Sequence, residues 1–160
     1  MLRERGFTLM ELMVALVIAG ILLVVTVPGF IRFRSSLVRD QVKWALVADL
    51  RYARQLAVTK HRPVVIAFGN GSTTTDITTY TLHTDSDGDG VKDSGELVLN
   101  RTLPRGGVLT LVSLAPVDTV IFDASGSLRP GATGGQIIYR GAQGNVDTLN
   151  VSAIGMVYHS

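Results

Sequence analysis

The feature that most constrains this chain is an uncharged, strongly apolar run over residues 12–31. At about 1.5 Å of rise per residue, a helix of about twenty residues spans the roughly 30 Å hydrocarbon core of a bilayer. Glu11 lies one turn inside the apolar segment, which begins at Phe7. An ionisable group at such a position is costly and is usually functional, with a partner of opposite charge. The sequence therefore predicts one transmembrane helix whose first turn carries a carboxylate that needs a cation.

The residues before Glu11 indicate where that cation comes from. The leader, residues 1–6, is short and polar, and it lacks the apolar region and the small-residue cleavage site of an ordinary secretory signal. Together with Gly6-Phe7 and Glu11, it closely resembles the class III signal of type IV pilins and pseudopilins. The resemblance implies cleavage after Gly6 by a prepilin peptidase and methylation of Phe7 as the new N-terminal residue. It also implies a helix-kinking proline at Pro28.

The spacing of these residues has a physical reason. Cleavage creates an α-ammonium group at Phe7, in apolar surroundings. If subunits stack with a stagger of about one helical turn, Glu11 of one subunit neutralises the amine of the next, and two desolvation penalties are removed together. The alternative is a plain membrane anchor with a tolerated glutamate near the interface, which leaves the leader unexplained. We therefore expect other pilins or pseudopilins as partners in a filament.

After the Pro28-Gly29 pair, which is expected to loosen or kink the helix, helical periodicity resumes. Apolar residues recur at intervals of three and four, as in the buried stripe of an amphipathic helix. The stripe consists of Val38, Val42, Leu46, Leu50, Ala53 and Ala57, and is widened by Trp44, Leu56 and Val58. Proline disfavours helix in the residue before it, so the helix is expected to end before His61-Arg62-Pro63.

From Pro63 onward, short β-type runs alternate with turn residues such as Gly134-Gly135. The expected strands are residues 64–68, 78–84, 97–101, 108–114, 119–122, 136–139, 148–152 and 156–158. Consecutive antiparallel strands with the helix stripe on one face predict an α+β, pilin-like fold, in which a long N-terminal transmembrane helix packs on a small antiparallel β-domain. The expected parts are the leader (1–6), the transmembrane and assembly helix (7–31), its amphipathic continuation (32–62) and a periplasmic β-rich domain (63–160).

An acidic segment, residues 85–96, matches the twelve-residue EF-hand calcium loop at every diagnostic position. Its expected Ca²⁺ ligands are the carboxylates of Asp85, Asp87, Asp89, Asp93 and Glu96 and the backbone carbonyl of Val91. The flanking residues resemble strands and not helices, so we expect a metal-braced tip of a β-hairpin. The alternative is a solvated acidic turn, rich in Asp and Gly for conformational reasons.

Features beyond the leader resemble the GspH/FimT group of pseudopilins and minor pilins. They are the long helix, the Ala-rich stretch 46–58, the acidic hairpin, Phe122-Asp123-Ala124-Ser125-Gly126 and the late Gly155. The resemblance implies one of two roles. One is a low-abundance subunit near the tip of the short periplasmic pseudopilus of type II secretion, which pushes folded exoproteins through the outer membrane. The other is a FimT-like minor pilin of a type IV pilus that binds DNA for uptake.

Nucleic acid is not expected as a partner. The DNA-binding branch carries a C-terminal Gly-Arg-x-Arg motif, whereas this chain reads Gly155-Met156-Val157-Tyr158. Phosphate binding needs cations, and the formal net charge is only +2. The outer half of the helix is basic, but its basic residues are spread around it. This favours a solvated face, with Arg32 and Arg34 at the level of the lipid headgroups, over a phosphate groove.

An enzymatic role is not expected either. The chain has no cysteine, and its histidines show no metal-ligand spacing, with His61 and His159 expected to be exposed. Ser125-Gly126 lacks the glycine that precedes the serine in a nucleophile elbow. The sequence thus predicts a minor pseudopilin of the bacterial inner membrane. Its periplasmic placement is implied by the leader, because Arg32, Arg34 and Arg39 after the span oppose the positive-inside rule.

Overall fold

The structure is a computed structural model of the whole chain. It describes residues 7–69, 76–113, 119–130, 132, 134–141 and 144–159, so the leader with Gly6 lies outside the described residues. Within this part of the chain there are one α-helix and eight β-strands. The chain forms two compact units, Met1–Arg34 and Ser35–Ser160.

The first unit contains the beginning of α1 (Leu9–Lys60). Thr8 caps the helix, because its Oγ1 accepts a hydrogen bond of 3.3 Å from the backbone N–H of Glu11. Pro28 lies inside the helix and does not end it. Every described residue from 7 to 34 is exposed, and the helix is long and apolar enough to cross a membrane. An uncovered apolar surface of this kind requires lipid or other subunits around it.

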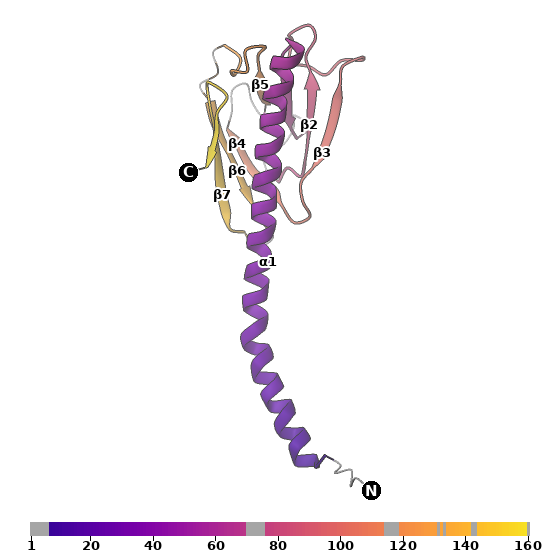
Figure 1. Cartoon of the computed structure of the whole chain (residues 1–160), viewed down its shortest axis with the longest axis vertical. Helices are drawn as coiled ribbons and strands as arrows, with labels where there is room; N and C mark the ends of the chain where they lie inside the picture. Colours follow the sequence, from indigo (N-terminus) through magenta and orange to yellow (C-terminus); the bar gives the residue numbers. More distant parts are fainter. Residues whose placement is uncertain are drawn as a thin grey trace. The chain divides into compact units, whose positions relative to one another are not determined.

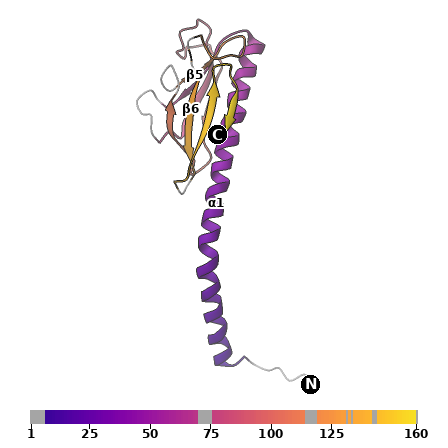
Figure 2. The ribbon, with the colours of Figure 1, turned by 90° about the vertical axis from the view of Figure 1, so that its left-hand side faces the viewer.

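The second unit consists of the remainder of α1 and two four-stranded sheets (Figures 1 and 2). The first sheet has the order β3-β2-β1-β5 and contains β1 (Val64–Phe68), β2 (Thr79–Thr84), β3 (Val98–Thr102) and β5 (Thr119–Phe122). The second has the order β4-β6-β7-β8 and contains β4 (Val108–Ser113), β6 (Gly134–Arg140), β7 (Val146–Ser152) and β8 (Val157–His159). Every pairing between these strands is antiparallel.

The α+β class and the antiparallel pairing are confirmed, but consecutive strands are not neighbours throughout, because the strands divide into two sheets. β5 pairs with β1, and β4 joins the other sheet beside β6. Strands adjacent in sequence are adjacent in space only about two-thirds of the time, and alternation of apolar residues does not specify the neighbour. Gly134 and Gly135, expected in a turn, begin β6. A Cβ at Gly134 would collide with the carbonyl oxygen of Val151, so the close pairing with β7 requires glycine there.

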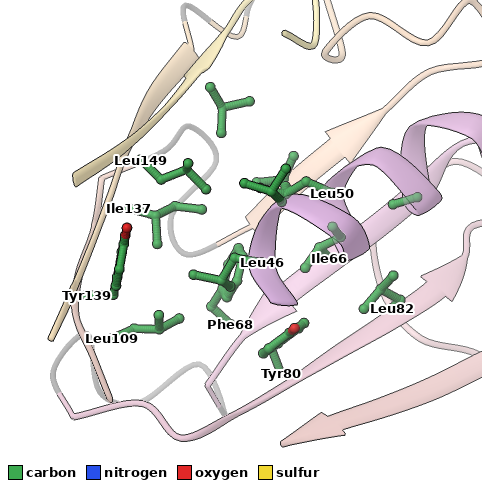
Figure 3. Close-up of a cluster of buried hydrophobic side chains, with 14 of the residues drawn as sticks. Leu46, Leu50, Ile66, Phe68, Tyr80, Leu82, Leu109, Ile137, Tyr139 and Leu149 are labelled. Atoms are coloured by element: carbon green, nitrogen blue, oxygen red, sulfur yellow. The ribbon is translucent and has the colours of Figure 1, made fainter. Parts of the chain in front are cut away.

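The core lies where the inner faces of both sheets meet α1 (Figure 3). Leu46 and Leu50 of the helix, Ile66 and Phe68 of the first sheet, and Ile137 of the second belong to one buried cluster. Its fully buried members each contribute about 1.5–3 kcal/mol relative to an exposed position. The apolar stripe predicted on α1 is confirmed along its centre, but the buried face of the helix is narrower than predicted.

Two residues expected to widen the stripe are exposed. Trp44 is 62% exposed and Val58 is 42% exposed, whereas Val47 is buried. At about 100° per residue, Trp44 lies about 200° around the helix from Val42, and Val58 about 100° from Ala57. Trp44 therefore projects away from the two sheets, whereas Val58 lies at the margin of the core, where its Cγ2 would be 2.9 Å from a Cβ at Gly126. Leu56 packs against the core, as expected.

Candidate functional site

The acidic loop, residues 85–96, connects β2 to β3 and lies against the outer face of the first sheet. On that face Val65 is paired with His83 on one side and with Ile121 on the other, and all three side chains are buried. A Cβ at Gly90 would lie 3.5 Å from Ile121 Cδ1. The loop thus folds back and covers apolar side chains of the sheet. The loop is the tip of the β2–β3 hairpin, as expected. Its fold-back was not expected, and it keeps Val65 and Ile121 from an exposure that would cost the free energy of their burial.

Asp85 organises the first half of the loop. Its side chain is fully buried, Oδ1 accepts a hydrogen bond of 2.7 Å from Gly88 N, and Oδ2 accepts one of 2.9 Å from Gly90 N. Both glycines have positive φ angles, 84° and 80°, which L side chains rarely adopt. Carboxylate oxygens of Asp85, Asp87 and Asp89 lie within 4.8 Å of one another. The structure therefore brings together three of the five expected acidic ligands.

Glu96 closes the second half of the loop. Its Oε1 accepts a hydrogen bond of 2.7 Å from Ser86 N, and its Oε2 accepts one of 2.9 Å from Asp93 N. These bonds, that from Asp93 N first, lower the pKa of the Glu96 carboxyl group. Neither Glu96 nor Asp93 belongs to the three-carboxylate group. Asp93 is exposed, and the charge of Asp87, followed by smaller contributions from the other carboxylates, raises its pKa.

The chemistry of this group suits a hard cation. Each of its carboxylate oxygens has two lone pairs, so the backbone hydrogen bonds of Asp85 leave capacity to coordinate an ion. Oxygen donors are the ligands of Ca²⁺. Val91 donates its N–H to Asp89 Oδ1 at 2.6 Å, which holds the residue expected to supply a backbone carbonyl next to the group. The donor set therefore fits Ca²⁺ chemically.

Arg129, which follows β5, is one of the residues that contact the loop and that the sequence reasoning did not connect with it. Its Nη2 donates a hydrogen bond of 2.8 Å to the carbonyl oxygen of Gly88. The guanidinium group fastens the loop and partly offsets the repulsion among its carboxylates. Gly88 and Arg129 are 41 residues apart, and no sequence signal connects them.

The expected assembly residues lie at the start of α1. Phe7 is 83% exposed, and Pro28 lies further along the same exposed helix. Glu11 is exposed, and its backbone N–H donates to the capping hydroxyl of Thr8. Thr8 was missed, although Thr-x-x-Glu is a known signature of helix N-termini. Negative charge near a helix N-terminus is favourable because the helix dipole is positive there. Glu11 therefore also contributes to the start of the helix.

The histidines form no catalytic constellation in the described residues. His61 and His159 are exposed, as expected. His159 Nε2 lies 2.6 Å from Asp147 Oδ1, which is a surface contact within the β-domain. His83 is buried beneath the acidic loop, neither of its ring nitrogens has a hydrogen-bond partner among the described residues, and burial lowers its pKa. It is therefore a neutral side chain that fills space.

Comparisons with known proteins agree with this arrangement. The family described as "Type II transport protein GspH" matches residues 45–155, and the "Prokaryotic N-terminal methylation motif" matches residues 1–27. A search of curated protein sequences gives no significant match.

Two solved structures are similar to the chain. Both are crystal structures of the type IV minor pilin FimU from Pseudomonas aeruginosa PAO1. The one in space group P21 has 19% identity and a TM-score of 0.54, and covers 76% of this chain and 90% of FimU. The one in space group P65 has 18% identity and a TM-score of 0.51, and covers 76% and 91%. At this identity the likeness shows a shared pilin fold, which confirms the predicted fold class.

Proposed function

This chain belongs to the GspH family of type II transport proteins, and we propose that it is a minor pseudopilin of a type II secretion pseudopilus. The observation that carries the proposal is the combination of an N-terminal methylation motif with an apolar helix whose described residues 7–34 are all exposed. A helix of this kind is stable in a lipid bilayer or inside a filament of similar helices. The remaining unit, with its own buried core, then presents a surface to neighbouring subunits or cargo.

In this proposal the chain is inserted in the inner membrane, with its β-rich unit in the periplasm, and prepilin peptidase cleaves between Gly6 and Phe7. The new amine of Phe7 lies at the positive end of the helix dipole and in apolar surroundings, so it is doubly unfavourable as a cation. The carboxylate of Glu11 from an adjacent subunit offsets both penalties. Assembly is favoured because the Glu11 carboxylate of each subunit pairs with the Phe7 ammonium group of its neighbour.

The alternative is a minor pilin of a type IV pilus that takes part in DNA uptake. It is favoured by Arg51 and Arg54, which line a groove of the β-rich unit and form no ion pair with any described residue. It is disfavoured by residues 155–158, which contain no arginine. Deletion of the protein, with exoprotein secretion and DNA uptake scored in parallel, separates the two roles. Loss of secretion alone supports the first, and loss of DNA uptake alone supports the second.

Assembly itself is tested by substitution at Glu11. We expect Glu11→Val to remain in the membrane and to be absent from sheared filaments, since the pairing carboxylate is gone. Thr8→Ala is the matched control, because it removes the cap on the same helix turn and leaves the charge in place. If Glu11→Val entered filaments as efficiently as the wild type, charge pairing would not drive assembly.

We also propose that residues 85–96 bind Ca²⁺, at the roughly 10⁻⁴–10⁻³ M affinity of extracellular modules. The proposal is supported by the complete ligand spacing of the sequence and by the convergence of Asp85, Asp87 and Asp89. Millimolar Ca²⁺ should raise the melting temperature, and Asp87→Ala should abolish the rise. Asp87 suits this test because its side chain is exposed and accepts only a long, 3.4 Å hydrogen bond from Asp89 N. Identical melting curves with and without Ca²⁺ would remove the proposal.

A further inference from the structure

A groove in the second unit lies between the end of α1 and two turns of the β-domain. It has a volume of about 500 Å³ and is lined by Arg51, Arg54, Gln55, Val58, Thr59 and Ser125. A smaller hollow of about 170 Å³ shares both arginines and is completed by Gly155, Met156 and Val157. The turn before the C-terminal strand and the first residue of that strand thus line this hollow together with the helix.

Arg54 is held in place at the centre of this groove. Its Nε donates a hydrogen bond of 2.8 Å to the carbonyl oxygen of Gly126. A Cβ at Gly155 would lie 3.4 Å from the same Nε and 2.5 Å from that carbonyl oxygen, so both turns close onto the arginine. The two Nη groups of Arg54 form no hydrogen bond or ion pair with a described residue. A guanidinium group fixed through Nε loses little freedom when its Nη groups bind a carboxylate.

Neither arginine of the groove forms an ion pair within the part of the second unit that the structure describes. Three other arginines in this unit are paired, in Arg39–Asp147, Arg101–Asp49 and Arg140–Asp76. Arg51 is exposed and has no such partner. The carboxylate of Asp123 is occupied within its own turn, where Oδ1 accepts hydrogen bonds from Ser125 N at 2.8 Å and Ser125 Oγ at 2.6 Å. A ligand with negative charge is therefore complementary to the groove.

β8 (Val157–His159) reaches this groove at its first residue, Val157. β8 is the edge strand of its sheet, and Ser152 N donates to Met156 O at 2.9 Å, which turns the backbone of Met156 toward β7. Because backbone groups alternate in direction along an antiparallel strand, those of Val157 point away from β7. An extended peptide beside an open edge gains main-chain hydrogen bonds, and its side chains select the partner.

We propose that this groove docks an extended, acid-bearing segment of a neighbouring pilin-type subunit. The segment pairs with the free edge of β8, and its carboxylates bind Arg51 and the Nη groups of Arg54. A peptide fits better than nucleic acid for two reasons. The groove also presents the apolar side chains of Val58 and Met156 and a strand edge that phosphates do not use, and its two free cations would neutralise few phosphates. The inference rests on the proposed role as a filament subunit.

The test uses the full chain in its native cells, with p-benzoylphenylalanine in place of Gln55, an exposed residue of the groove. Irradiation should give an adduct with another pilin-type subunit, through a peptide that contains Asp or Glu. Arg51→Glu should reduce the adduct by about tenfold or more, equivalent to about 1.4 kcal/mol, and Arg51→Lys should retain most of it. The same photoreactive residue in place of Asn100, an exposed position on β3, should not give this adduct.

Four results would overturn the inference. They are an adduct with nucleic acid, an adduct with a protein outside the pilin class, an adduct that is unchanged in Arg51→Glu, and the absence of an adduct in assembled filaments. Sheared filaments are assayed for the wild-type chain in the same experiment. If the wild type is present there without an adduct, only the docking inference fails. If the wild type is missing from filaments, the proposed function fails and the docking inference fails with it.

Discussion

Arg54 Nε donates a 2.8 Å hydrogen bond to the carbonyl oxygen of Gly126, which lies 72 residues further along the chain. Gly155 packs against the same carbonyl oxygen, so that one guanidinium group joins the helix to two separate turns of the β-domain. The late glycine is therefore a packing requirement of the fold. It lets the last turn approach the helix closely enough to form the groove.

Substitution of this glycine should be costly for two separable reasons. Gly155 has a φ of 74°, and an added Cβ would also lie 2.5 Å from Gly126 O. Gly144 has a nearly equal φ of 77° with no atom within 4 Å, so Gly144→Ala measures the conformational cost alone, about 1–2 kcal/mol. We expect Gly155→Ala to lower the free energy of unfolding by at least about 1 kcal/mol more. Equal losses in urea denaturation would show that the turn is not tightly packed.

Tyr80 joins the first sheet to α1 through a partly buried hydrogen bond. Its Oη donates to Asp49 Oδ2 at 2.7 Å, and Arg101 Nε lies 3.2 Å from the same oxygen. Burial and then the bond to Asp49 raise the pKa of the phenol, so it remains a donor. Tyr80→Phe should lower the free energy of unfolding by about 1–2 kcal/mol. Tyr158→Phe, at an exposed position, should change it little, and equal effects of the two variants would contradict the assignment.

Asp147 should make stability depend on pH. Burial alone would raise the pKa of its carboxyl group, but hydrogen bonds from His159 and Thr148 N outweigh burial and hold the pKa below its usual value. A carboxyl group whose pKa is lower in the folded state stabilises the fold above its unfolded pKa of about 3.9. This contribution is lost as pH falls through the lower folded pKa. The wild type should thus lose its advantage over Asp147→Asn as the pH falls below about 4 in thermal melts. A difference that stays constant as the pH is lowered from 7 into the acid range would contradict the effect.

Arg129 should control the order of the acidic loop. Arg129→Ala removes the bond of 2.8 Å to Gly88 O, so amide hydrogen exchange over residues 85–96 should accelerate by about tenfold, equivalent to about 1.4 kcal/mol of local stability. Arg105→Ala is the matched control, since Arg105 is also exposed but forms no hydrogen bond with the described residues of the loop. Unchanged exchange in Arg129→Ala would mean that Asp85 and Glu96 hold the loop without it.

The sequence predicts local structure here far better than it predicts contacts between distant elements. Helical spacing identifies α1 to its last residue, Lys60, and the short apolar runs identify the strands to within two residues. The fold-back of the acidic loop was missed, although a signal exists. Residues 64–68 are apolar without interruption, as in a strand buried on both faces, and α1 covers only one of them. Contacts such as Arg54–Gly126 have no sequence signal because they depend on which strands pair.

Identification of the mature N-terminus by mass spectrometry tests the central claim most directly. The protein would be isolated from the membranes and filaments of cells that contain their own prepilin peptidase. The account predicts a chain that begins at Phe7, carries one methyl group on its α-amine and lacks residues 1–6. A filament-borne chain that retains Met1 through Gly6 would contradict it, because the cation that pairs with Glu11 would never form.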